Sequence, residues 1–159
     1  MSTVYILLGG NQGDPAANFS IAKNELEHKA GNILRESSLY NTAAWGFAAQ
    51  PDFLNQVIII NTTFTPAEVL EVCLGIEKLV GRIRTIKNAP RLIDLDILFY
   101  DSDIIDEAML KIPHPRIPER KFVLVPLCEL SPNLLHPGLR KTIRQLLEES
   151  SDTLDVKRI

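Results

Sequence analysis

Three features that would assign this chain to other classes of protein are scarce or missing from its 159 residues. Its two cysteines are too few for a disulfide framework. No apolar run approaches the roughly 18 residues that a membrane-spanning helix needs, and no charged leader precedes the short apolar stretch near the N-terminus. We therefore expect a cytoplasmic protein without a membrane partner, in which Cys73 and Cys128 are reduced core residues rather than ligands or nucleophiles.

A surplus of positive charge is missing as well. The 17 Lys and Arg residues are outnumbered by 20 Asp and Glu residues, so the formal net charge at pH 7 is −3. A general nucleic-acid surface needs a basic face or stripe. We therefore expect no nucleic-acid partner and assign the local group of arginines to a small anionic ligand. We also expect the protein to be a monomer.

Linkers, internal repeats and low-complexity segments are also absent. Hydrophobic residues make up 45% of the chain, and a chain of this length buries about 70% of the surface that its unfolded form exposes. Residues 1–159 are therefore expected to form a single domain.

The hydrophobic periodicity and the turn signals predict an alternation of strands and helices. Strands are expected over residues 3–8, 33–40, 53–64 and 90–99. Capping and stop signals predict helices over residues 15–30 and 66–80, and an amphipathic pattern predicts a last helix over residues 142–148. Because no helix separates residues 33–40 from 53–64, these two strands are expected to pair antiparallel. The order favours an α+β fold, a sheet with helices packed on it, over a doubly wound parallel sheet.

Residues 90–99, PRLIDLDILF, carry the most information in the chain. A strand's period of two puts Asp94 and Asp96 on one face, with α-carbons about 6.6 Å apart, and the apolar Ile93, Leu95, Ile97 and Phe99 on the other. Two such carboxylates suit a pair of magnesium ions roughly 3.5–4 Å apart, as used to clamp a phosphate under attack. The alternative is an ordinary exposed sheet face that happens to carry two charges.

A group of basic residues directly precedes this pair. Arg82, Arg84, Lys87 and Arg91 lie in a segment without clean periodicity, which predicts a loop. A solvated basic loop is one interpretation. A basic loop followed by a carboxylate pair also fits the binding of a triphosphate with its magnesium. Glu77 lies near this loop, where a surface role and a ligand contact both remain open.

Several motifs occur in an order that is typical of one enzyme family. They are Gly9-Gly10-Asn11, Gln50-Pro51-Asp52-Phe53-Leu54-Asn55, Arg82-Ile83-Arg84, Pro90-Arg91 with Asp94-Leu95-Asp96, and Pro113-His114 followed by the run from Arg120 to Leu127. Together they resemble the 6-hydroxymethyl-7,8-dihydropterin pyrophosphokinase family of folate biosynthesis, over the chain from Val4 to about Pro132. The resemblance implies a ferredoxin-like α+β fold. It also implies transfer of the terminal diphosphate of ATP, with two Mg²⁺ ions, to the hydroxymethyl group of the pterin, releasing AMP.

The resemblance also implies roles for individual residues. The phosphate-contacting, catalytic residues would be Arg82 and Arg91, and the magnesium ligands would be Asp94 and Asp96. The nucleotide contacts would be Glu77, Arg84, the backbone around Ile97, His114 and Arg120. The pterin contacts would be Thr42, Trp45, Gly46, Phe53, Asn55 and Phe122. On the hydrophobic pattern alone, Phe53 and Phe122 would be assigned to the core and His114 to the surface.

Two other functions are compatible with the same motifs. A two-metal nucleotidyltransferase would also use a Gly-Gly turn and an Asp-x-Asp strand, but it would release pyrophosphate where the diphosphate transfer releases AMP. A ferredoxin-like sensor would bind the nucleotide or pterin without turnover. One departure from the family pattern is that Asn88-Ala89 stands before Pro90, where the family usually has Trp-Gly, so an apolar contact over the bound substrates is lost.

Overall fold

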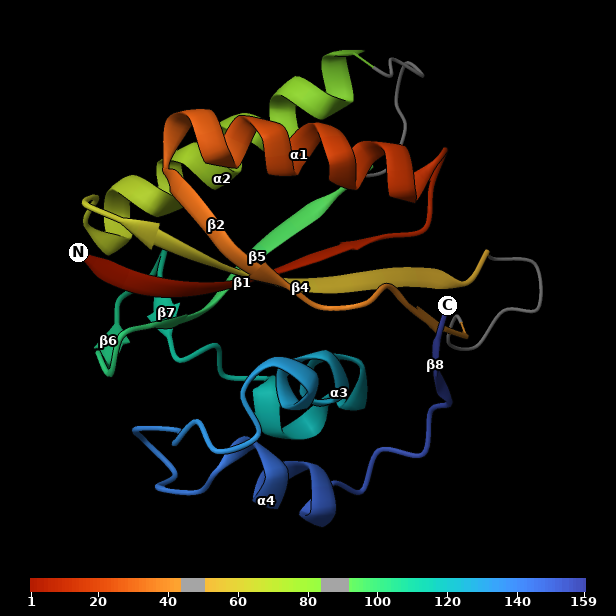
Figure 1. Ribbon diagram of the computed structural model, residues 1–159, viewed down its shortest axis with the longest axis vertical. Helices are drawn as coiled ribbons and strands as arrows, with labels where there is room; N and C mark the ends of the chain where they lie inside the picture. The colour runs from red at the N-terminus through yellow and green to blue at the C-terminus, as the bar shows by residue number, and fades with distance from the viewer. Residues whose placement is uncertain (44–50, 84–91) are drawn as a thin grey trace.

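An antiparallel sheet lies between two layers of helices in the computed structural model, which describes residues 1–43, 51–83 and 92–159 (Figure 1). Of Arg82 and Ile83 only the backbone is described. In chain order the elements are β1 Ser2–Gly10, α1 Pro15–Lys29, β2 Gly31–Glu36, β3 Tyr40–Thr42, β4 Phe53–Thr62, α2 Pro66–Ile83, β5 Asp94–Tyr100, β6 Ile105–Asp106, β7 Lys111–Ile112, the 3₁₀ turn η1 Ile117–Glu119, α3 Lys121–Leu130, α4 Ile143–Glu149 and β8 Val156–Arg158.

The strand order confirms the predicted fold class. The main sheet runs β5-β1-β4-β3-β8, and β2 also pairs with β4. All of these pairings are antiparallel. The order β5-β1-β4-β2, with α1 and α2 as the two connections, is the split βαβ arrangement of a ferredoxin-like fold. Helices α1 and α2 cover one face of the sheet, and α3 and α4 cover the other (Figure 1).

Alternating side chains fill a core on each face of the sheet. On β1, Val4, Ile6 and Leu8 pack with α1 and α2, whereas Tyr5 and Leu7 pack with α3 and α4. A strand with both faces covered has a continuous run of apolar residues, as residues 4–8 show. Within the described parts of the chain, none of the helices combines the length and hydropathy needed to cross a membrane.

The local signals at the helix starts are confirmed. The side chain of Asp14 accepts a hydrogen bond from Ala17 N at 3.2 Å. Thr65 and Glu68 form the reciprocal capping box, with bonds of 2.9 and 3.2 Å. The predicted last helix is also present, as α4 behind the N-cap Thr142. Cys73 is fully buried, and this burial raises the pKa of its thiol to about 12, as expected for an inert core residue.

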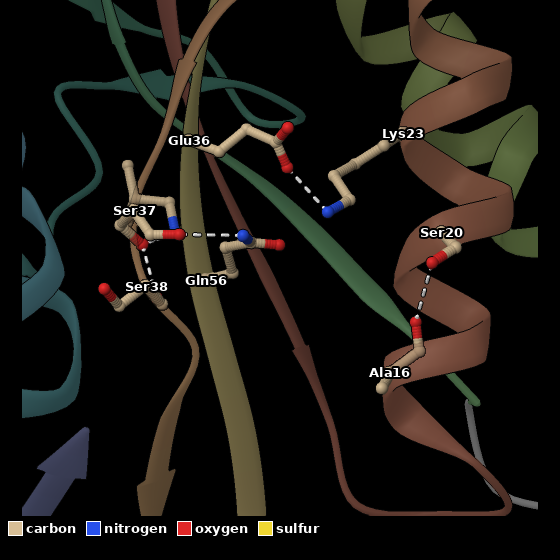
Figure 2. A network of polar contacts seen from close by, with 8 residues as sticks. Ala16, Ser20, Lys23, Glu36, Ser37, Ser38 and Gln56 are labelled. Carbon is tan, nitrogen blue, oxygen red and sulfur yellow. Dashed lines mark hydrogen bonds and ion pairs between the residues drawn. The ribbon is translucent and has the colours of Figure 1, made fainter. Parts of the chain in front are cut away.

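The prediction of a single strand over residues 33–40 is wrong, because the structure has two strands there, β2 and β3. Ser37 stands at the break, where its hydroxyl accepts a hydrogen bond from Val57 N at 3.0 Å. Its carbonyl accepts a second bond from the side chain of Gln56 at 2.8 Å (Figure 2). The backbone N–H of Ser37 still donates to Val57 O at 2.8 Å, but side chains take over the remaining bonds of the ladder at this point. The predicted antiparallel pairing with β4 holds on both sides of the break.

Two further features, the end of one helix and the face on which one side chain lies, differ from the sequence-based expectation. Helix α2 does not end at Gly81 but continues to Ile83. Phe99 does not share a face with Ile97, because the pairing of β5 with β1 shifts register and both Leu98 and Phe99 turn toward α3 and α4. Such a β-bulge inserts one residue and reverses the alternation beyond it. Asp94 and Asp96 precede the bulge and keep their shared face.

His136 lies buried beside Phe99, and we expect it to make the stability of the folded protein depend on pH. It is 7% exposed, its ring packs at 5.7 Å from the Phe99 ring, and its Nδ1 accepts hydrogen bonds from Gly138 N and Leu139 N. Burial lowers the pKa of His136 below its usual 6.5. The unfolded chain therefore protonates His136 more readily than the folded protein does. The contribution of His136 to the free energy of unfolding is complete above pH 6.5, the pKa in the unfolded chain, and is lost as the pH falls from there through the lower pKa of the folded protein.

We expect His136→Asn to remove this dependence, because the amide oxygen can accept the same bonds without titrating. The melting temperature of the wild type should fall on the order of 2–4 °C further than that of the variant between pH 7 and pH 5. Thermal unfolding followed by circular dichroism at both pH values measures the difference. Parallel pH profiles for the two proteins would show that His136 is not the group responsible.

Candidate functional site

The carboxylates of Asp94 and Asp96 lie on the same face of β5, as their spacing predicts. Asp94 is paired with Gly9 of β1, and Asp96 with Leu7. Residues directly opposite in an antiparallel ladder point to the same side of the sheet. Leu7 belongs to the core under α3 and α4, so the two carboxylates also face this side.

Gly9 opens a space between Asp94 and Asn55. The pairings place Asp94, Gly9, Asn55 and Tyr40 side by side across four strands. A Cβ atom at Gly9 would lie 3.0 Å from the side-chain oxygen of Asn55, which is tighter than an ordinary contact. The absence of a side chain at Gly9 therefore leaves the floor of the sheet accessible between an amide and a carboxylate.

A pocket of about 690 Å³ occupies this space. Its floor comes from the sheet, and its walls come from η1, the start of α3 and the chain that follows α4. It is lined by Leu7, Gly9, Thr42, Ala43, Phe53, Asn55, Asp94, Asp96, Pro118, Glu119, Arg120, Phe122, Glu149, Ser151, Asp152 and Leu154. The structure thus brings together Thr42, Phe53, Asn55, Asp94, Asp96, Arg120 and Phe122 from the set of residues that the sequence singled out.

Two aromatic rings line the pocket from opposite layers. Phe53 begins β4 and is 36% exposed, so its assignment to the core on hydrophobic pattern is wrong. Phe122 lies in the first turn of α3 and is partly buried against the core below. The guanidinium carbon of Arg120 lies 5.6 Å from the centre of the Phe122 ring, within the range of a cation–π contact. A flat ligand can therefore meet aromatic surface from both the sheet and α3.

Buried polar side chains lie deeper in the same pocket. Thr42 and Asn55 are each 3% exposed. The hydroxyl oxygen of Thr42 has no hydrogen-bond partner among the described residues. A buried polar atom without a partner costs free energy unless a ligand or water completes it. These two residues are therefore suited to the polar edge of a bound molecule.

A second pocket, of about 280 Å³, lies at the edge strand β5. Asp96 lines both pockets, so the two cavities border the same residue of β5. Of the five predicted nucleotide contacts, Ile97 and His114 line the second pocket, and Arg120 lines the first. The arrangement suits a ligand that reaches from the second pocket past Asp96 into the first.

The groups around this junction have defined partners. Glu77 on α2 accepts a hydrogen bond from Leu95 N at 2.8 Å, so its carboxylate is tied to the strand between the two aspartates. His114 donates its backbone N–H to Leu98 O at 3.0 Å, and its Nδ1 accepts from Arg116 N at 3.1 Å. Burial is the main cause that lowers the pKa of His114, and the charges of Arg120 and Arg116 lower it further, while Asp96 raises it. The lowered pKa favours the neutral imidazole, which accepts the hydrogen bond from Arg116 N.

Some predicted site residues lie outside the described part of the chain. Trp45 and Gly46 fall in residues 44–50, and Arg84 and Arg91 fall in residues 84–91. The backbone of Arg82 belongs to the last turn of α2. The proposed phosphate contacts of these arginines therefore rest on the sequence.

The sequence analysis missed the wall formed by the last part of the chain. Glu149, Ser151, Asp152 and Leu154 line the pocket, although the segment after Ser150 carries no periodic pattern. The one local signal is turn chemistry, since Ser150 and Asp152 are residue types that bond nearby backbone groups. That signal predicts a turn but not its place beside a pocket.

The sequence matches a family of known proteins over most of its length. A model of the family described as 7,8-dihydro-6-hydroxymethylpterin-pyrophosphokinase (HPPK) matches residues 5–132. The 2-amino-4-hydroxy-6-hydroxymethyldihydropteridine pyrophosphokinase of Aquifex aeolicus is 40% identical over 151 residues, which cover 95% of this chain and 94% of that protein. The folic acid synthesis protein fol1 of Schizosaccharomyces pombe is 39% identical over 146 residues, which cover 91% of this chain and 20% of that protein.

A solved structure supports the same fold. The crystal structure of a Plasmodium falciparum HPPK-DHPS triple mutant aligns with a TM-score of 0.76 at 18% identity, covering 93% of this chain and 41% of that chain. At this identity the likeness concerns the fold alone. The family match and the relative that aligns along nearly its whole length decide the assignment. The chain belongs to the 7,8-dihydro-6-hydroxymethylpterin-pyrophosphokinase family.

Proposed function

We propose that this protein transfers the terminal diphosphate of ATP to the hydroxymethyl group of 6-hydroxymethyl-7,8-dihydropterin in folate biosynthesis. The substrate hydroxyl oxygen attacks the β-phosphorus of ATP, the bond from this phosphorus to the bridging oxygen of the α-phosphate breaks, and AMP leaves. The hydroxyl proton passes to water. The observation that carries the proposal is the single pocket in which Asp94 and Asp96 lie beside Phe53, Asn55 and Phe122.

The aromatic end of the pocket fits a pterin. A flat heteroaromatic ring gains from contact with aromatic faces, and Phe53 and Phe122 present such faces from two layers of the protein. The pterin ring has an amide-like edge with donors and acceptors. The amide of Asn55 offers both kinds of group, and the hydroxyl of Thr42 can complete its hydrogen bonds there.

The carboxylate end fits a polyphosphate with magnesium. The described residues contain no group of three or more His, Cys, Asp or Glu side chains that could enclose a metal ion. Asp94 and Asp96 would therefore supply part of the coordination shell, and phosphate oxygens and water the rest, as Mg²⁺ prefers. When bound, two Mg²⁺ ions would neutralise the charge that develops on the phosphates.

The protein's own contribution is positioning. The nucleoside would occupy the second pocket beside Ile97 and His114, so that the phosphates pass Asp96 toward Arg120. The pterin, held between the aromatic residues, would direct its hydroxymethyl group to the same place. Holding two reactants in line converts a bimolecular step into an effectively unimolecular one. The monomeric state and the cytoplasmic location stay predictions from the sequence.

The products of the reaction test the proposal. Purified protein with ATP, Mg²⁺ and 6-hydroxymethyl-7,8-dihydropterin should yield AMP and the pterin diphosphate in equal amounts, measured by chromatography. Release of pyrophosphate with a nucleotidylated pterin would instead support the nucleotidyltransferase. Saturable binding of both ligands without any product would support the sensor. The names of the curated relatives, which are pyrophosphokinases, favour the first outcome.

We expect Asn55→Leu to weaken pterin binding about 30- to 150-fold while nucleotide binding is unchanged. Leucine has nearly the shape of asparagine but loses the two hydrogen bonds that the buried amide offers, each worth about 1–1.5 kcal/mol. The KM for the pterin and the dissociation constant of ATP measure the two effects. Asn61→Leu is the matched control, because Asn61 lies at the other end of β4, with its side chain on the same face, but does not line either pocket. Equal KM values for the two variants would contradict the role of Asn55.

A further inference from the structure

The last ten residues of the chain form a strap along one wall of the pocket. After α4 the chain runs through Ser151, Asp152 and Leu154, which line the pocket, and ends in β8 (Figure 1). Strand β8 pairs with β3, where Val156 lies opposite Thr42. The backbone of Ile159 continues the contact by donating to Leu39 O at 2.9 Å. The strap thus extends the sheet next to the strand that carries Thr42.

Asp152 links this strap to the start of α3. One of its carboxylate oxygens accepts a hydrogen bond from Lys121 N at 2.9 Å, and the other accepts from Leu154 N at 3.0 Å. The N–H of Asp152 itself donates to the hydroxyl of Ser150 at 3.2 Å. Both oxygens of one carboxylate are therefore used, one within the strap and one on the helix.

The bond to Lys121 replaces a missing helix cap. The residue in the N-cap position of α3, Arg120, makes no side-chain capping bond. The first N–H groups of a helix lack partners within the helix, and a carboxylate near them is favourable both as an acceptor and as a charge. Asp152, 31 residues further along the chain, supplies that carboxylate.

The capped turn carries two residues of the substrate pocket. Arg120 and Phe122 flank Lys121 directly, and their side chains contact each other at 5.6 Å. Both line the pocket together with Asp152. A shift of the Lys121 backbone would therefore move the guanidinium and the aromatic ring at the same time.

We propose that Asp152 is a positioning residue, which fixes the first turn of α3 and thereby orients Arg120 and Phe122 toward the substrates. The proposal rests on the function proposed above for the identity of those substrates. Asp152 acts through the helix backbone, so its loss should change how well substrates are held. The folding of the two cores, which are formed by other residues, should be retained.

The test compares Asp152→Ala with Asp155→Ala, which removes the same charge from the same strap. Asp155 is exposed, and its ion pair with Lys157, at 3.4 Å, lies between two side chains that are each at least 70% exposed. We expect Asp152→Ala to raise the KM for the pterin about tenfold, equivalent to about 1.4 kcal/mol, with a smaller change in kcat. Asp155→Ala should match the wild type. Asp152→Asn keeps one acceptor oxygen, so its KM for the pterin should lie between those of Asp152→Ala and Asp155→Ala.

Amide hydrogen exchange gives a second readout that does not depend on turnover. The amides of Lys121 and Leu154 should exchange faster in Asp152→Ala than in Asp155→Ala, while the amides of β1 and β4 remain protected. Unchanged exchange at Lys121 would overturn the proposed link. Faster exchange with an unchanged KM would overturn the positioning role. If the wild type released no AMP, the proposed function would fail, and the exchange at Lys121 would still decide whether Asp152 holds α3.

Discussion

Asp96→Ala is expected to abolish magnesium-dependent nucleotide binding and to lower turnover by about 10³-fold or more. The reason is that Asp96 lines both pockets, the one proposed for the nucleoside and the one proposed for the pterin. Removing it would leave phosphate charge without the cation that neutralises it. Asp94→Ala should have a smaller effect, because Asp94 lines only the larger of the two pockets.

Calorimetric titration with ATP, in Mg²⁺ and in EDTA, measures this effect. The wild type should bind more tightly with Mg²⁺, whereas Asp96→Ala should bind equally weakly in both buffers. Asp103→Ala is the control, because it removes the same charge from an exposed turn just beyond β5. A normal affinity of Asp96→Ala for ATP in Mg²⁺ would count against the assigned role of the carboxylate pair.

Arg91→Ala is expected to lower turnover by about 10²–10³-fold while ATP binding survives. A guanidinium can bind two phosphate oxygens at once and should act most strongly on the charge that develops during transfer. Arg91 itself lies outside the described residues. It directly precedes Leu92, whose carbonyl accepts a hydrogen bond from the buried side chain of Asn18 at 3.3 Å. Two residues separate Arg91 from Asp94, so three steps along the chain place their α-carbons within about 11 Å of each other.

Single-turnover kinetics and a parallel ATP titration separate the chemical step from binding. Arg116→Ala is the control, because Arg116 is an exposed arginine paired with Glu119 at 3.2 Å and lines neither pocket. Arg91→Lys should recover only part of the rate, since an ammonium keeps the charge without the planar, bidentate geometry. Turnover of Arg91→Ala at the wild-type rate would refute the role.

The parts of the fold that depend on short stretches of sequence could be predicted. The helix starts at Asp14, Thr65 and Thr142 follow from side chains that bond backbone groups three residues away. The shared face of Asp94 and Asp96 follows from the period of a strand. In each case the cause lies within a few residues of the feature.

The parts that were missed depend on contacts far along the chain. Phe99 turns to the opposite face because β5 shifts its register against β1, and this pairing joins residues more than 90 positions apart. The break at Ser37 arises from bonds to β4, about 20 residues away. The cap of α3 comes from Asp152, which no pattern near residue 121 could indicate. Each of these features needs the tertiary arrangement.

The candidate site shows the same division. The two carboxylates could be predicted from their spacing. Phe53 has the hydrophobicity of a core residue, and it lines a pocket only because α3 lies over this end of β4. The resemblance to a family supplied that information for Phe53 and Phe122. It did not supply the C-terminal strap, which lies beyond the matched residues 5–132.

The most direct test of the account is a crystal structure with Mg²⁺, a non-hydrolysable ATP analogue and 6-hydroxymethyl-7,8-dihydropterin. The account predicts that oxygens of Asp94 and Asp96 lie about 2.0–2.1 Å from Mg²⁺, which also binds the phosphates. It further predicts that the pterin ring lies between Phe53 and Phe122. Side chains of Asp94 and Asp96 turned apart, or a nucleotide bound away from both of them, would contradict it.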